Sequence, residues 1–391
     1  MISAILFWFC VFAMFHSYVL FPLLLNVFSR GKKLNSIIFS STDADLPNVY
    51  LLMAVYNEEK VIRQKLESVF STSYPLNKIH VYVGSDNSID ETNNIVQEFS
   101  TVNFFNYRGR NGKPTILNQL MLELEDRMNP LTDVLMFTDA NVFFETNTIY
   151  EMVKHFKNKS IALVGANILN KGVRADGISY QETSYIQREN GIKYLEGLNW
   201  GTMMGAFGGG YALQANCWRP IPPTFIVDDF YLSMNVLAKK QSAILELNSV
   251  CYEDVSNEME NEFNRKTRMQ AGNFQNLSVY WKQLFRFDMV SFCFLSHKVI
   301  RWCGPLFLLL AFISNLFLLQ VNTFYQLTFL LQCFLLLSPI VDSAFKKINL
   351  HLSLLRFASY FIIMNLALAK GFLVFVKGIE SNAWNRTERN V

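Results

Sequence analysis

The sequence predicts an α/β domain with a largely parallel sheet, held between hydrophobic segments at both ends of the chain. Two observations support this prediction. Between about residues 46 and 277, short apolar runs alternate with longer amphipathic stretches, a pattern typical of buried parallel strands joined by crossover helices. The runs are Val49–Val55, Ile79–Gly84 and Val134–Thr138. The chain is also 51% hydrophobic and only 17% charged, which is too apolar for an ordinary soluble protein.

The first hydrophobic segment predicts a transmembrane helix over residues 1–30. Ile2–Phe28 contains no Lys, Arg, Asp or Glu, and a helix of about 20 apolar residues spans the hydrocarbon core of a bilayer. A signal peptide would have a basic start and a shorter apolar centre, and neither is present. Basic residues follow directly, at Arg30, Lys32 and Lys33. The positive-inside rule therefore places the domain over residues 46–277 in the cytoplasm.

Three kinds of segment follow the central domain. Residues 278–302 mix aromatic and basic side chains, which is typical of an amphipathic helix at the membrane interface; a core helix with a charged face is the alternative. Residues 303–376 are apolar enough for transmembrane segments, and residues 377–391 form a tail. The expected spans are Cys303–Val321 and Thr323–Val341, with Leu354–Val376 as a third candidate. Lys370 lies inside the third and is costly if it faces lipid, so that segment either crosses the membrane or turns back along the interface.

Polar side chains follow each of the three predicted strands. They are Asn57 and Glu58 after the first strand, Asp86 after the second, and Asp139 with Asn141 after the third. In open α/β sheets ligands bind beyond the carboxyl ends of the strands, so these residues are candidates for contact with a ligand. The carboxylate of Asp86 is suited to accept the imino N–H of a uracil-like base. The alternative is structural, because acidic residues there also stabilise the start of the next helix.

Two of these residues predict a divalent-cation site. Asp139 and Asn141 are two positions apart, so in an extended chain their side chains point to the same side. Mg²⁺ and Mn²⁺ prefer oxygen ligands and commonly bridge to substrate phosphates. Lys113, in the basic loop over residues 107–114, is suited to bind the base or the phosphates of a nucleotide. A solvated basic turn is the alternative for that loop.

The ordered set of motifs resembles the family 2 glycosyltransferases of GT-A fold, the group that includes cellulose, hyaluronan and poly-N-acetylglucosamine synthases. The resemblance extends from Tyr50 to Trp384. The motifs that carry it are Asn57-Glu58-Glu59, Asp86 with Asp90-Glu91-Thr92, Lys113, Asp139-Ala140-Asn141, Val227-Asp228-Asp229 and Arg265-Lys266-Thr267-Arg268. It implies a GT-A nucleotide-diphospho-sugar transferase domain, with a Rossmann-like mixed sheet, between N- and C-terminal transmembrane helices. It further implies that Asp86 contacts the base of the donor and that Asp139 contacts the nucleotide or its metal.

The sequence departs from the family pattern at two places. The metal motif of the family usually ends in Asp, and Asn141 stands there instead. A neutral oxygen ligand binds a divalent cation more weakly, so the expected Mg²⁺ or Mn²⁺ site is weakened. Processive synthases also carry Gln-x-x-Arg-Trp, whereas Arg265 and Met269 replace its Gln and Trp here. Arg268 is retained, which leaves diphosphate binding in place and weakens the case for a long polysaccharide product.

Asp228 and Asp229 are the candidates for catalysis. Inverting sugar transfer needs a general base that takes the proton of the acceptor hydroxyl, and the resemblance points to Asp229. Two adjacent carboxylates at the start of a helix are the structural alternative, because residues 230–237 have a helical pattern. Arg268 is suited to meet the departing diphosphate through its planar fork of N–H donors.

The leading hypothesis is therefore a membrane-bound inverting glycosyltransferase, with a UDP-hexose or UDP-N-acetylhexosamine donor and a glycan or lipid acceptor. It would act in polysaccharide biosynthesis at the cell envelope, in the plasma (inner) membrane with its catalytic domain in the cytoplasm. A lipid acceptor, either a polyprenyl phosphate or a glycolipid, is the alternative within enzymes. A non-catalytic membrane scaffold or transporter is the alternative of another class. The net charge of +3 gives no reason to expect a nucleic-acid partner.

Overall fold

The computed structural model describes residues 1–174, 178–348, 350 and 352–379. The predicted tail lies outside these residues from position 380 onward, and so does Trp384. The described chain forms one eight-stranded sheet with the strand order β3-β2-β1-β4-β7-β6-β8-β5. The strands are β1 Val49–Val55, β2 Ile79–Ser85, β3 Val102–Asn106, β4 Val134–Thr138, β5 Val142–Phe144, β6 Ile161–Lys171, β7 Gly210–Gln214 and β8 Ser242–Asp254.

The sheet is mixed rather than parallel throughout. Strands β3, β2, β1 and β4 are parallel to one another, as expected from the apolar runs. Strand β7 then runs antiparallel to both β4 and β6, and β5 runs antiparallel to β8. The mixed sheet implied by the family resemblance is therefore confirmed, whereas the parallel sheet expected from the runs describes only one half of it.

Helices cover both faces of the sheet. The helices of this domain are α3 Ile62–Phe70, α4 Thr92–Gln97, α5 Lys113–Leu124, α6 Thr148–Val153, α7 Ser179–Trp200, α8 Asp228–Ala238 and α9 Met259–Tyr280. One hydrophobic core joins alternate residues of β1, such as Leu52, to α5 and α8. A second core joins the intervening residues, such as Leu51, to α3, α4 and α6. Because both faces are buried, the strands carry uninterrupted apolar residues, which explains why the sequence predicts β1, β2 and β4 so closely.

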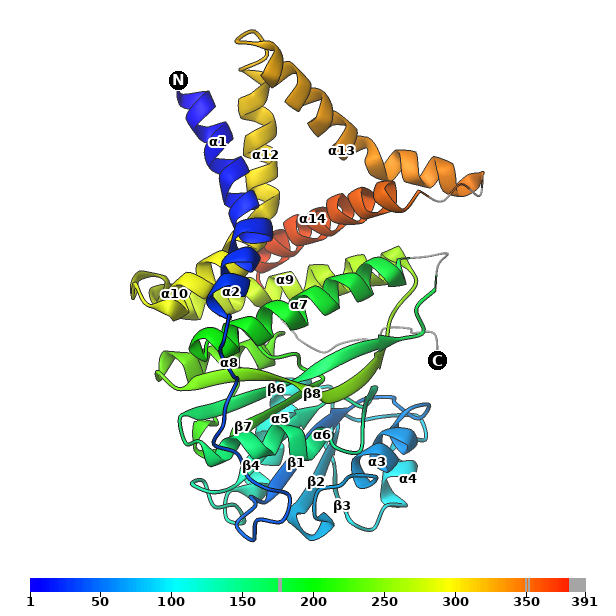
Figure 1. Cartoon of the computed structure of the whole chain (residues 1–391). Coiled ribbons are helices and arrows are strands. Elements are labelled where there is room, and N and C mark those ends of the chain that lie inside the picture. The colour runs from blue at the N-terminus through cyan, green and yellow to red at the C-terminus, as the bar shows by residue number, and fades with distance from the viewer. Residues whose placement is uncertain (175–177, 349, 351, 380–391) are drawn as a thin grey trace.

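Apolar helices from both ends of the chain gather on one side of the domain (Figure 1). They are α1 Ile2–Phe15, α2 Phe21–Phe28, α10 Met289–Cys293, α11 Ile300–Trp302, α12 Gly304–Leu316, α13 Thr323–Lys347 and α14 Ser353–Lys377. By length and composition, three described helices could cross a membrane: Ile2–Phe28, Thr323–Lys347 and Ser353–Lys377. Met289–Trp302 and Gly304–Leu316 are long and apolar enough to cross a membrane only if they are taken together as one span. The chain bends by 65° between them.

The predicted span Cys303–Val321 corresponds to α12, which is shorter than the predicted segment. Helix α12 has only 13 residues and ends at Leu316, although the sequence remains apolar beyond it. The chain turns there because polar groups close a helical hairpin: Asn315 donates to Thr328 and Gln332 of α13, at 3.1 and 2.9 Å. The hydropathy of the sequence alone does not predict such a turn.

Helix α14 lies across the domain beside α9 rather than alongside α1 and α12 (Figure 1). Gly371 permits this close approach, since a Cβ atom there would lie 2.5 Å from the carbonyl oxygen of Thr267 in α9. The ammonium group of Lys370 lies 5.2 Å from the ring centroid of Phe263, also in α9. These contacts favour the expectation that this segment turns back along the interface.

The Gly371 contact generates a stability prediction. Gly371→Val should lower the free energy of unfolding by about 1–3 kcal/mol, the usual cost of overpacking, because α14 must move away from α9. Thermal unfolding of the purified chain in lipid nanodiscs measures the effect. Leu373→Ala, at an exposed position of the same helix, is the control and should change the midpoint far less. Equal midpoints for G371V and the parent chain would contradict the packing described here.

Candidate active site

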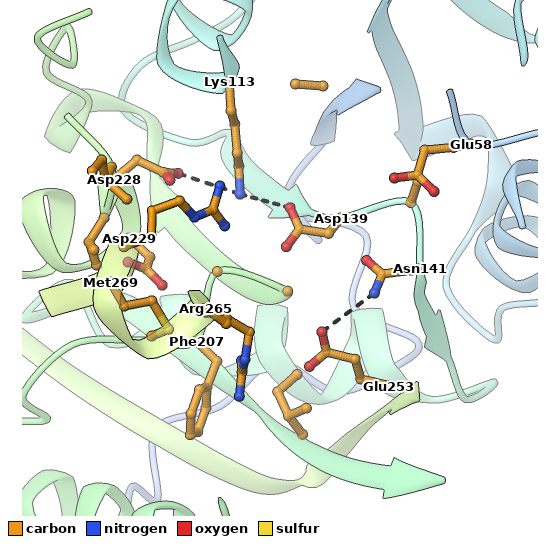
Figure 2. A pocket seen from close by; sticks show the side chains of 18 of the residues that line it. Glu58, Lys113, Asp139, Asn141, Phe207, Asp228, Asp229, Glu253, Arg265 and Met269 are labelled. Atoms are coloured by element: carbon orange, nitrogen blue, oxygen red, sulfur yellow. Dashed lines mark hydrogen bonds and ion pairs between the residues drawn. The ribbon is translucent and has the colours of Figure 1, made fainter. Parts of the chain in front are cut away.

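A cavity of about 250 Å³ lies at the carboxyl ends of β1 and β4 (Figure 2). Its walls come from the strand tips, from the first turns of α5 and α8, from the end of β8 and from α9. Most of the residues predicted from the sequence line it: Glu58, Lys113, Asp139, Asn141, Asp229 and Arg268. Residues far apart in the chain therefore meet at one place, as the sequence hypothesis requires.

Lys113 is the central cation of the cavity. Its Nζ atom lies 2.7 Å from Oδ1 of Asp139 and 3.7 Å from Oδ2 of Asp228, as Figure 2 shows. Burial by itself would lower the pKa of Lys113, but the charges of Asp139 and Asp228 outweigh burial and raise it above its usual value. Lys113 is thus held as a cation. The preceding Gly112 has φ +83°, a backbone conformation that favours glycine, and it turns the chain into α5.

Asp228 and Asp229 occupy the first turn of α8. The backbone N–H of Phe230 donates to Oδ1 of Asp229 at 2.6 Å. Burial and then the neighbouring charge of Asp228 raise the pKa of Asp229 to about 6. The helix-start interpretation and the catalytic interpretation are therefore compatible, because the helix start is what presents the carboxylate to the cavity.

The second oxygen of Asp229 faces a glycine that the sequence analysis does not assign. A Cβ atom on Gly208 would lie 3.0 Å from Oδ2 of Asp229 and 3.6 Å from Nζ of Lys113. Phe207, Gly208 and Gly209 all line the cavity. The signal in the sequence is the cluster of glycines at 205 and 208–210, but nothing in their spacing connects them with Asp229.

Asn57 and Asp86 are not among the residues that line the cavity. Asp86 is buried and its two carboxylate oxygens accept the backbone N–H groups of Asn111 and Gly112, at 2.6 and 3.1 Å. The Oδ1 atom of Asn57 accepts the N–H of Ile89 at 2.9 Å. In this structure both side chains order the loops at the strand tips, and contact of Asp86 with a base stays a prediction.

The two arginines of the α9 motif, Arg265 and Arg268, have different surroundings. Arg265 forms ion pairs with Glu182 at 2.5 Å and with Glu262 at 2.9 Å, so its guanidinium group joins α9 to α7. Both arginines line the cavity. Arg268 is the more exposed of the two, whereas the guanidinium group of Arg265 is held by the two glutamates.

The predicted cation ligands Asp139 and Asn141 lie beside each other at the end of β4 (Figure 2). The amide of Asn141 donates to Oε1 of Glu253 at 3.5 Å. Within the described ranges, no group of three or more His, Cys, Asp or Glu side chains is arranged to hold a metal ion. The chain offers one carboxylate and one amide oxygen, which fits a hard cation that takes its remaining ligands from a bound diphosphate.

Comparisons with known proteins agree with this geometry. Residues 50–213 match the family model described as Glycosyl transferase family 2. "Probable glycosyltransferase YdaM" of Bacillus subtilis (strain 168) is 33% identical over 130 residues. This match covers 31% of the present chain and 30% of that protein, so the chain spans less than a third of that relative.

A solved structure extends the likeness to nearly the whole chain. The mannosyltransferase PcManGT from Pyrobaculum calidifontis, in complex with GDP-Man and Mn²⁺, aligns with a TM-score of 0.69 at 17% identity. The alignment covers 96% of the present chain and 99% of that one. At this identity the similarity establishes a shared fold.

The Gly208 contact predicts an effect on catalysis. Gly208→Ala should lower turnover of a nucleotide sugar about tenfold or more, because the added methyl group displaces Asp229 from its place in the cavity. Release of nucleoside diphosphate by the purified chain in nanodiscs measures it. Gly191→Ala is the matched control, since a Cβ atom at that position meets nothing within 4 Å. Unchanged turnover in G208A would separate Gly208 from the reacting groups.

Proposed function

Because residues 50–213 match the family model Glycosyl transferase family 2, we propose that the chain is a membrane-bound inverting glycosyltransferase. It transfers a sugar from a nucleoside-diphosphate donor, a UDP-hexose or UDP-N-acetylhexosamine, to a hydroxyl group of a glycan or lipid acceptor. The observation that carries this proposal is that Asp229, Lys113 and Arg268 line one cavity. The alternative of a non-catalytic scaffold or transporter has no support, since the family 2 domain identifies an enzyme.

In the proposed reaction, Asp229 is the general base. The acceptor oxygen attacks the anomeric carbon from the face opposite the diphosphate while its proton passes to Asp229. The bond between that carbon and the diphosphate oxygen breaks, and the configuration of the sugar inverts. A pKa of about 6 suits the task, because the carboxylate is ionised near neutral pH yet basic enough to accept a proton.

Cations in the cavity stabilise the leaving group. Negative charge grows on the diphosphate as its bond to the sugar breaks, and a cation held in place lowers the energy of that transition state. Arg268 and Lys113 are the side chains in the cavity suited to this role. Asp139 and Asn141 would hold a divalent cation, which when bound neutralises further charge on the diphosphate; Mn²⁺ accompanies the donor in the archaeal mannosyltransferase.

We also propose that residues 278–302 lie at the membrane interface. Phe287 is 92% exposed and has φ +56°, a conformation that costs a bulky residue about 1–3 kcal/mol. Insertion of a Phe side chain into lipid regains about 1.5–3 kcal/mol, so the strain is offset only when the ring is covered. Trp281 and Phe285 are exposed beside it. Figure 1 shows α10, which follows directly, projecting sideways at the foot of the α1–α12 pair.

The proposed base generates a test of the function. Asp229→Asn should reduce transfer by about 10²- to 10⁴-fold, because the amide cannot accept the proton. In the parent chain the rate should fall as the pH drops below about 6, where Asp229 becomes protonated. The assay is release of nucleoside diphosphate from a panel of UDP-sugars and GDP-mannose, with and without Mn²⁺. It uses the full chain in nanodiscs with native lipid and glycan extracts as acceptors.

Asp254→Asn is the control for D229N, since Asp254 also lines the cavity but belongs to the end of β8. Its effect on the rate should be much smaller and should leave the acid limb of the pH profile in place. Full activity in a folded D229N variant would remove Asp229 from its role. Absence of turnover with every donor would count against the function itself.

The interface proposal is tested by adding a tryptophan at the exposed turn. Phe287→Trp should show additional fluorescence quenching in nanodiscs that contain lipids brominated along the acyl chain, because the ring is inserted among them. Leu122→Trp, at an exposed position of α5 in the catalytic domain, should show none. Equal quenching of the two variants would place the turn in water.

A further inference from the structure

Two π-helical turns meet where the N-terminal helix packs against the segment before α12. They are η1 (His16–Leu20) and η6 (Phe294–Val299). The hydroxyl group of Ser17 donates to the carbonyl oxygen of Ser296 at 2.6 Å, and the ring of His16 hydrogen-bonds the hydroxyl group of Ser296 at 2.8 Å. Single π turns inside helices occur frequently at functional sites, and here two of them bond directly to each other.

The η6 turn presents His297 to two glutamates of α7. The side chain is fully buried, with Nδ1 2.8 Å from Oε1 of Glu196 and Nε2 3.0 Å from Oε2 of Glu189. The ring of His297 therefore bridges the two glutamates, with one carboxylate at each ring nitrogen. Its Nε2 atom also lies 3.2 Å from Nζ of Lys298.

Glu189 connects this bridge to the membrane side. It also forms ion pairs with Lys298 at 3.0 Å and with Arg301 at 2.5 Å. Burial alone would raise the pKa of Glu189, but Lys298, His297 and Arg301 together hold it well below its usual value. Arg301 in turn donates to the hydroxyl and carbonyl oxygens of Ser17, at 3.3 and 3.2 Å. Both π turns are thus bound to α7 through one ionised carboxylate.

Glu196 connects the bridge to the catalytic side. Its second oxygen accepts the backbone N–H of Met204 at 2.9 Å, at the start of the loop that continues to Gly208 beside Asp229. Two residues further on, the N–H of Ala206 donates to the hydroxyl group of Ser233 at 3.0 Å. That hydroxyl group donates to the carbonyl oxygen of Asp229 at 2.7 Å. The loop is therefore held at one point by Glu196 and at the next by the helix that carries Asp229.

We propose that His297 is a positioning residue for the transfer reaction. By fixing Glu196, His297 positions the loop over residues 204–209 against Asp229. The geometry of the general base therefore depends on how the two π turns pack against α7. The proposal rests on the proposed function. It assigns His297 no contact with the substrate, and its signature is a loss of turnover without a loss of donor binding.

The test uses the full chain in nanodiscs with two variants. His297→Gln removes the ring that joins Glu189 to Glu196. Glu196→Gln leaves one acceptor oxygen where two hydrogen bonds are received, so either His297 or Met204 loses its partner. Both variants should lower kcat about tenfold or more, while the affinity for UDP measured by calorimetry stays within twofold of the parent chain. E196Q carries the same test if H297Q does not fold.

His155→Gln is the matched control. His155 is also buried and lies 2.7 Å from Oε2 of a buried glutamate, Glu246. The polar partners of this pair include Asn35, Lys154 and Asn248, none of which belongs to the loop over residues 204–209. The variant should lose thermal stability and keep the kcat of the parent chain. Parental kcat in folded H297Q or E196Q would overturn the proposal, and so would a parallel loss of kcat and UDP affinity. Failure of the parent chain to turn over any donor would instead count against the proposed function.

Discussion

A row of buried glutamates on α7 is the constraint on which the arrangement of the chain depends. Glu182, Glu189 and Glu196 are spaced by seven residues, and each is less than 4% exposed. Positions seven apart lie on the same face of a helix.

Basic side chains that follow much later in the sequence bind these glutamates: Arg265 and Lys266 at the first, Lys298 and Arg301 at the second, and His297 between the second and the third. Removal of one partner from such a buried pair leaves a charge without compensation, which is strongly destabilising. Helix α9 and the segment before α12 are therefore held in a fixed position on α7.

The balance of acidic and basic side chains also determines the properties of the cavity on the other side of the domain. Asp139, Asp228 and Asp229 are close enough to repel one another, and Lys113 is the cation that lies among them. Burial, and then the charge of Asp228, raise the pKa of Asp229 to about 6, a value suited to a base. In the α7 row Glu182 and Glu189 are each paired with two basic side chains, whereas in the cavity Lys113 lies among three acids. That difference separates the part of the chain that holds the fold from the part suited to chemistry.

Much of the fold follows from the sequence because β1, β2 and β4 are buried on both faces and therefore appear as uninterrupted apolar runs. The other half of the sheet could not be predicted in this way. Strand β6 begins with a buried apolar run over residues 161–166, but polar and partly exposed residues follow it. Strand β8 is exposed in its middle, at residues 247–248, and β7 is short and begins with a glycine.

For the site, position along a strand predicted which residues lie near the cavity but not where each side chain points. Asp139 and Asp229 face the cavity, whereas Asp86 turns toward the backbone of the loop at residues 111–112. The seven-residue spacing of the glutamates is visible in the sequence, yet their partners lie between about 80 and 110 residues away along the chain, so no local pattern identifies them. The contact between Gly208 and Asp229 could not be predicted for the same reason, since it arises only where the glycine-rich loop meets α8.

The packing of α14 against α7 and α9 limits where the chain can be truncated. The helix contacts α9 at Gly371, and the hydroxyl group of Tyr360 donates to Glu182 of α7. A fragment that ended before α12 would lose both contacts and would expose the buried carboxylate together with the apolar face of α9. The apolar helices at the end of the chain thus form part of the support behind the cavity, and a fragment cut at the end of the sheet domain would lack that support.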